Sequence, residues 1–128
     1  MAQNSLLAKS KVAKRGVEFL LQCWESRGKI KYAGHDSQIG TDWEKLKYPF
    51  TDYRILKSLD TLSQFKFIKN DPRLKEMVHA LVSKQDANGR FTPESIHQVW
   101  SDFDFGQKEK PSFWVTFLAL RILKRLFE

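Results

Sequence analysis

The side chains that could perform acid–base chemistry are few. Two segments carry an acid, an aromatic residue and a second acid: residues 42–44 read Asp-Trp-Glu, and residues 102–104 read Asp-Phe-Asp. Paired carboxylates can serve as general acid and general base where their surroundings move their pKa values apart. Because the same triplet occurs in two loops, we interpret it as a repeated structural element. The sequence therefore predicts no catalytic residue.

Residues that bind metals or phosphates are also poorly arranged. Cys23 is the single cysteine, and His35, His79 and His97 show no spacing that would gather them around one ion. The chain has neither a glycine-rich phosphate loop nor a nucleophile elbow. We predict no metal site, no cofactor and a non-enzymatic role.

Large aromatic side chains are the more promising set. They lie in the two long segments between predicted helices, or at the starts of the helices that follow, and so toward one end of a bundle. Such a group can cap a hydrophobic core, or it can line a surface for an apolar ligand or a protein partner. The candidate residues for that surface are Trp43, Tyr48, Tyr53, Trp100, Phe103, Phe113 and Trp114.

Four amphipathic helices would position these aromatic residues. The third has the clearest boundaries, because Asp71 can cap its first turn and Gly89 can close its end in a left-handed conformation. Apolar residues at the i, i+3, i+4, i+7 spacing define all four. The predicted helices cover about 5–26, 52–66, 72–88 and 112–127, joined by long loops over 28–49 and 89–111.

Two of these helices raise specific expectations. Gly16 interrupts the first, and we expect another helix to cross closely there. The last helix is apolar over most of its circumference, so it should have partners on more than one side.

One offset relates the two halves of the chain. Residues of similar kind recur 61 positions apart, and we interpret this as an internal repeat of a helical hairpin. The copies cover about 5–70 and 71–128 of a single domain. The related pairs include Val17 and Val78, Gly28 and Gly89, Leu56 and Phe117, Leu59 and Leu120, and Leu62 and Leu123.

The second copy carries Gln85, Gly89 and Phe91 as Q-x-x-x-G-x-F. This pattern resembles the Gln-to-Gly-to-aromatic motif of the squalene cyclase and protein prenyltransferase superfamily. The order of segments 41–65, 70–91 and 111–127 is similar to the C-terminal part of archaeal and bacterial proteins built from prenyltransferase-like repeats. The resemblance implies an all-α fold of two αα-hairpins, forming a segment of an α/α toroid.

Two hairpins cannot close such a ring. The resemblance therefore implies a protein partner, either a second copy or another protein, that covers the open helical edge. It also implies an isoprenoid-like ligand, because members of the superfamily bind isoprenoid chains in an aromatic-lined cavity. Phe105 stands where class II terpene cyclases complete their D-x-D-D motif with an acid. An alternative is a fragment of an isoprenoid-processing enzyme whose catalytic residues lie outside this chain.

The net charge of +7 and the pI near 9.6 suggest a second alternative, a nucleic-acid-binding helical module. However, Lys and Arg are spread along all four predicted helices, as on a solvated outer surface. No apolar run approaches the roughly 20 residues that span a bilayer, and a single cysteine suits a reducing compartment, so we expect a cytoplasmic location. Our prediction is a non-catalytic helical repeat scaffold that binds a protein partner or an apolar ligand.

Overall fold

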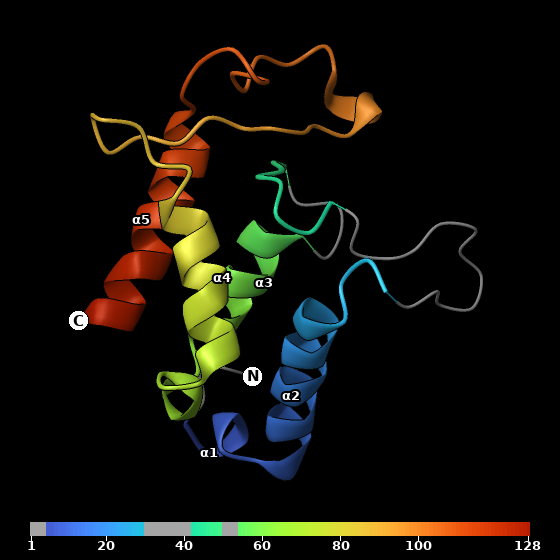
Figure 1. Ribbon diagram of the computed structural model, residues 1–128, viewed down its shortest axis with the longest axis vertical. Coiled ribbons are helices and arrows are strands. Elements are labelled where there is room, and N and C mark those ends of the chain that lie inside the picture. Colours follow the sequence, from blue (N-terminus) through green and yellow to red (C-terminus); the bar gives the residue numbers. More distant parts are fainter. Residues whose placement is uncertain (1–4, 30–41, 50–53) are drawn as a thin grey trace.

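The computed structural model describes residues 5–29, 42–49 and 54–128, which form helices joined by long irregular segments (Figure 1). These residues contain no β-strand, only an isolated parallel bridge between Lys47 and Ser95. The all-α prediction is therefore confirmed. The elements are α1 (Ser5–Ala8), α2 (Lys11–Glu25), α3 (Ile55–Leu62), α4 (Pro72–Val82) and α5 (Phe113–Phe127), with 3-10 turns at Lys66–Ile68 and Gln98–Trp100.

The first predicted helix is broken into α1 and α2. The break occurs at Ser10, whose hydroxyl oxygen accepts a hydrogen bond from the Ala13 amide at 3.2 Å and so begins a new helix. The prediction of one continuous helix over residues 5–26 is wrong at this point. The second predicted helix, over 52–66, is observed as the shorter α3 within the part of the chain that the structure describes.

The boundaries of α4 agree with the prediction at one end only. The Asp71 carboxylate accepts a hydrogen bond from the Arg73 amide at 2.9 Å, as expected for a cap at the first turn. The helix then ends at Val82, well before the predicted end. Gly89 is left-handed, with a φ of +76°, but it belongs to a separate turn beyond the helix.

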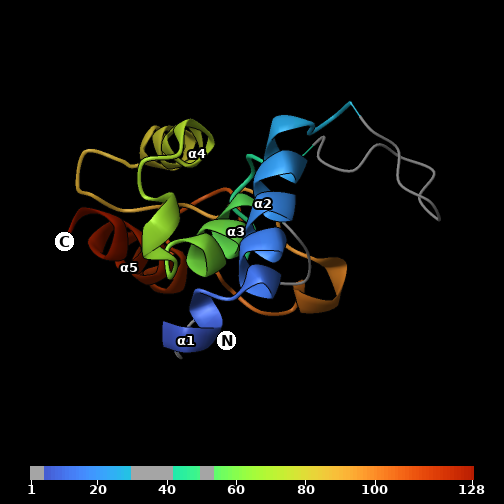
Figure 2. The same ribbon diagram turned by 90° about the horizontal axis from the view of Figure 1, so that it is seen from below.

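Helix α3 lies at the centre of the packing. It packs against α5 and α4, while α2 packs against α4 (Figure 2). Both ribbon views place α2 and α5 on opposite sides of α3. The apolar residues of α3 are fully buried as a result; they are Ile55, Leu56, Leu59 and Leu62.

The described end of the first long segment, residues 42–49, meets the second long segment above the helix ends (Figure 1). The Leu46 amide donates to Glu94 Oε2 at 2.7 Å, and the Glu94 amide donates back to the Leu46 carbonyl at 2.7 Å. The Lys84 ammonium group donates to the same carboxylate at 2.8 Å. Leu46 is fully buried, so this part of the first loop packs onto the core.

Gly16 does not mark a close helix crossing among the described residues. A methyl group at this position would contact nothing within 4 Å. Alanine restricts the unfolded chain more than glycine does, and it suits a helix better. We therefore expect Gly16→Ala to raise the free energy of unfolding by about 0.5–1 kcal/mol, measured by urea denaturation.

Gly89 provides the control for that substitution. Its φ of +76° is a conformation that alanine adopts only with strain. Gly89→Ala should therefore lower the free energy of unfolding by about 1–2 kcal/mol. A loss of stability in Gly16→Ala would contradict the open environment assigned to Gly16.

Candidate partner-binding surface

The structure brings four of the predicted aromatic residues together. Tyr48 stacks on Trp114, with ring centroids 6.4 Å apart and planes 13° from parallel. Tyr48 also meets the edge of Phe105 at 5.5 Å, and Phe103 continues the row to Trp100 at 5.7 Å. Phe103 and Phe105 lie 6.2 Å apart. The segment before α5 is thus held by an aromatic cluster, to which the sequence analysis had not assigned Phe105.

The other three predicted residues do not join this cluster. Trp43 is buried in the core, where its ring meets the edge of Trp24 at 6.3 Å, so its assignment to a binding surface is wrong. Phe113 is 95% exposed at the start of α5. Tyr53 lies outside the described residues.

One acid of the second triplet, Asp104, stabilises a turn. The Asp104 carboxylate accepts hydrogen bonds from the Gly106 amide at 2.9 Å and from the Lys110 ammonium group at 2.7 Å. The bond from Lys110 lowers the pKa of Asp104 below its ordinary value. Asp104 is therefore ionised at neutral pH and is a poor proton donor.

The first triplet has a similar character. Asp42 lies 3.1 Å from the Lys45 ammonium group and 3.5 Å from the guanidinium group of Arg54. The hydrogen bond from Lys45 is the main cause that lowers the pKa of Asp42. Both triplets thus hold charged, ion-paired acids at turns. Among the described residues there is also no group of three or more His, Cys, Asp or Glu that could hold a metal ion.

The Q-x-x-x-G-x-F segment forms a closed turn after α4. The Gln85 side-chain amide donates to the Gly89 carbonyl at 3.1 Å. The Asp86 carboxylate accepts from the amides of Asn88 and Arg90 at 2.8 and 2.9 Å. Phe91 then enters the core with no exposed surface. The motif in this chain is therefore structural, since its polar groups bond to each other.

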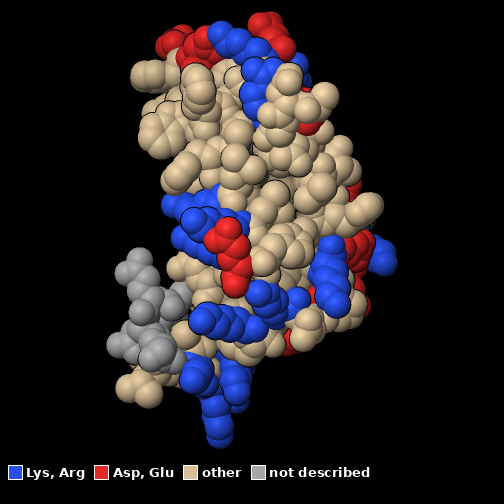
Figure 3. All heavy atoms as spheres, turned by 90° about the vertical axis from the view of Figure 1, so that its left-hand side faces the viewer, with Lys and Arg blue, Asp and Glu red and all other residues tan. Residues whose placement is uncertain are grey.

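The most conspicuous exposed feature is an apolar row along α5. Phe113, Phe117, Leu120 and Phe127 recur at the spacing that places side chains on one side of a helix. We call these four residues the α5 face. Their exposures are 95%, 53%, 45% and 72%, respectively. Figure 3 views the molecule from the side on which α5 lies and shows a broad uncharged area with Lys and Arg gathered below it.

The internal offset of 61 gives this face a counterpart on α3. Leu56 and Leu59 of α3 correspond to Phe117 and Leu120 of α5, yet the α3 residues are fully buried. The difference arises because α3 is packed against both α4 and α5, whereas no helix among the described residues covers the α5 face.

An ion cluster fixes the α3–α5 contact. The Asp60 carboxylate accepts from Arg121 at 2.7 Å and from Arg125 at 3.0 Å. These two arginines therefore share one carboxylate on the side of α5 that meets α3. Their pairing orients α5, so that its apolar row faces away from α3.

No described helix is both long and apolar enough to traverse a lipid bilayer. Comparisons of the chain with models of known protein families, with curated proteins and with solved structures gave no match. The exposed α5 face is therefore the feature from which we infer a function.

Proposed function

We propose that this protein is a non-catalytic helical scaffold that binds a second protein chain through the α5 face, and that this second chain is another copy of itself. The observation that carries the proposal is the exposed row formed by Phe113, Phe117, Leu120 and Phe127. A contiguous exposed apolar patch typically marks an interaction site.

The 61-residue offset between similar residues of α3 and α5 supports a helix as the occupant. In α3, the residues that correspond to the α5 face are buried in a helix that packs against both α4 and α5. A helix lying on α5 as α5 lies on α3 would bury Phe117 and Leu120 in the same way. We also propose that the helix pairs α2–α3 and α4–α5 are two neighbouring repeats of an α/α toroid. The packing of α2 on α4 and of α3 on α5 supports this arrangement.

Helix α2 supplies a surface that could receive the α5 face of a second copy. Val12 and Phe19 are largely exposed, and Gly16 lies between them at helical spacing. Because glycine has no side chain, another helix can approach α2 closely at this point. Since α2 and α5 lie on opposite sides of α3, the copies would associate head to tail (Figure 2).

Electrostatic repulsion should modulate this association. Lys11, Lys14 and Arg15 are exposed on α2, Lys124 is exposed on α5, and the chain carries a net charge of +7. Salt screens repulsion between such surface charges. Self-association should therefore strengthen as the salt concentration rises.

Native mass spectrometry and sedimentation velocity at low and high salt test the proposal. We expect dimers or larger assemblies that grow with protein concentration. Phe117→Asp should weaken the association roughly 10- to 100-fold, because it places a charge at the centre of a desolvated contact. Gly16→Leu changes the other partner in the contact. It should also weaken the association, because the leucine side chain blocks the close approach of α5 to α2.

Val99→Asp is the matched control, because Val99 is a largely exposed apolar residue outside both the α5 face and the aromatic cluster. It adds the same charge and should leave the association unchanged. A wild-type chain that stays monomeric at every concentration and salt level would contradict the proposal. A retained isoprenoid-sized adduct would instead favour the ligand-binding alternative.

A further inference from the structure

A groove runs between α4 and the C-terminal end of α5. It encloses about 310 Å³, and its floor is formed by the buried residues Leu74, Val78 and Leu126. Val82 and Phe127 form partly exposed apolar walls. The groove shares only Phe127 with the α5 face, so it is a separate feature of the surface.

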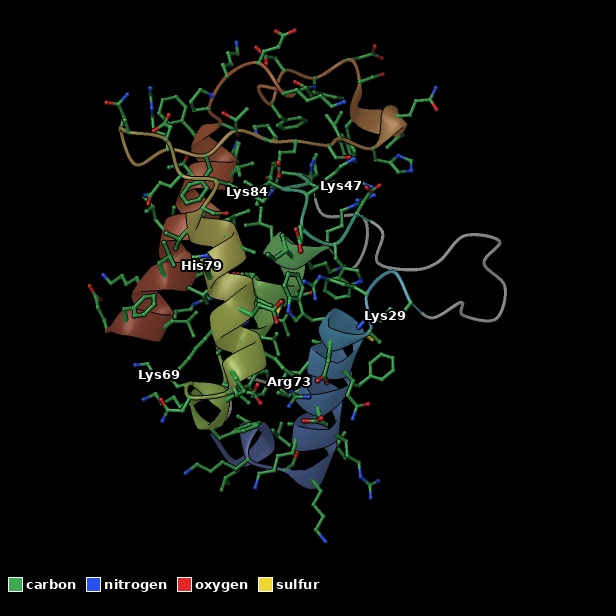
Figure 4. The ribbon with its side chains drawn as sticks, viewed as in Figure 1. Lys29, Lys47, Lys69, Arg73, His79 and Lys84 are labelled. Carbon is green, nitrogen blue, oxygen red and sulfur yellow. The ribbon has the colours of Figure 1, made fainter. Side chains whose placement is uncertain are left out.

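The rim of this groove is basic. Lys69, Lys75 and His79 line it, and Figure 4 shows Lys69 and His79 on the part of α4 and its preceding turn that is near the end of α5. None of the three side chains pairs with a carboxylate in the part of the chain that the structure describes. The rim therefore carries positive charge that the protein itself does not neutralise.

Neighbouring basic groups are already neutralised. The Arg73 guanidinium group binds Glu18 and Asp71, both at 2.8 Å. Asp71 also occupies the Arg73 amide at the start of α4, so this helix end is capped from within the chain. The charge available to a ligand in the groove is thus that of the ammonium groups of Lys69 and Lys75.

We infer that the groove binds a single-chain carboxylate amphiphile, such as a medium-chain fatty acid. The apolar chain would lie on Leu74, Val78 and Leu126, and the carboxylate would meet the ammonium groups of Lys69 and Lys75. This combination matches the usual ligand site, in which an apolar lining is joined by a few convergent polar groups. Selective binding of this ligand needs both the apolar floor and the cationic rim. The floor alone would also accept an alcohol of the same chain length, and the rim alone would also accept a small anion.

The size of the groove limits the ligand. A volume of about 310 Å³ is at the lower end of the range for small-molecule sites, roughly 300–1,000 Å³. One medium-length chain suits this space better than a two-chain lipid. The ammonium groups of the two lysines can bind either a carboxylate or a phosphate. The small volume favours a carboxylate, because it is the smaller head group.

Titration of the ¹⁵N-labelled full chain with sodium decanoate, below its critical micelle concentration, tests this inference. We expect saturable chemical-shift changes centred on the amides of Leu74, Val78, Val82 and Phe127. Decanol, which has the chain without the charge, and butyrate, which has the charge on a short chain, should each bind at least roughly tenfold more weakly.

Variants separate the two halves of the site. The double variant Lys69→Gln/Lys75→Gln should weaken decanoate binding by roughly tenfold or more, since it removes both charge-assisted contacts. Val82→Asp should weaken it similarly by placing a negative charge on a partly exposed wall. The matched control Lys29→Gln/Lys57→Gln removes two exposed lysines that do not line the groove and should leave the affinity unchanged.

Several results would overturn the inference. These are an absence of saturable shifts, shifts centred on the aromatic cluster around Phe105, equal affinity for decanol, or an equal loss in the control double variant. A variant can separate this outcome from self-association, although Phe127 belongs to both surfaces. Phe117→Asp, designed to disrupt the contact between copies, should retain decanoate binding because Phe117 does not line the groove.

Discussion

Leu59→Ala is expected to lower the free energy of unfolding by about 2–5 kcal/mol. Leu59 has no exposed surface and lies on α3, which packs against both α4 and α5. Truncating its side chain removes apolar contacts and leaves a cavity that close-packed neighbours fill only in part. Urea denaturation followed by circular dichroism measures the change.

The internal offset provides a matched control in Leu120→Ala. Leu120 corresponds to Leu59 but is 45% exposed on α5, so its truncation should cost about 1 kcal/mol or less. The comparison should be made at concentrations where the chain is monomeric, because Leu120 belongs to the proposed contact between copies. Equal losses in the two variants would show that α3 is not the more buried helix.

Phe91→Ala is expected to be still more damaging, at about 3–5 kcal/mol. Phe91 is fully buried, and its backbone joins the segment after α4 to the start of α5. Its amide donates to Thr116 Oγ1 at 2.9 Å, and its carbonyl accepts from the Ser112 amide at 3.0 Å. Loss of the ring should therefore weaken both the core and the docking of α5. Denaturation monitored by near-UV and far-UV circular dichroism reports both effects.

Phe113→Ala is the control for Phe91→Ala, because Phe113 is 95% exposed. Its free energy of unfolding should remain within about 0.5 kcal/mol of the wild-type value. Phe91→Leu should recover most of the stability by refilling the space with an apolar side chain. A small loss in Phe91→Ala would mean that the turn after α4 does not hold α5 in place.

Local signals in the sequence were sufficient for several features of the fold. The start of α4 was predictable because Asp71 can reach the first amides of the helix without any tertiary contact. The start of α5 was predictable for a related reason, with the Ser112 hydroxyl oxygen 3.4 Å from the Val115 amide. Apolar spacing also located the buried side of α3 correctly.

Other features depended on competition between local interactions. Ser10 sits within a helical pattern, but its hydroxyl group begins a new helix, and periodicity alone does not detect this. Beyond Val82, Asp86 binds amides of its own turn and Gln85 binds the Gly89 carbonyl, so these side chains favour a turn over a longer helix. The apolar pattern had assigned Gln85 to the helix.

The candidate surface was the least predictable part. Trp43 and Trp100 are both tryptophans in long segments between helices. Trp43 is nevertheless buried, because its ring packs against Trp24 of α2. The apolar circumference of α5 indicated a need for several partners, but only the position of α3 determines which side remains open. Such contacts between distant residues are not encoded in local spacing.

The position of α3 also has a consequence for synthesis of the chain on the ribosome. Asp60 binds Arg125, which is 65 residues later, and the apolar side of α3 packs against α5. A nascent chain that ends before α5 therefore presents α3 without one of the two helices that pack against it. Contacts this distant in sequence form late in folding. The final helix thus completes the burial of a segment made much earlier, which makes the incomplete chain a natural client for chaperones.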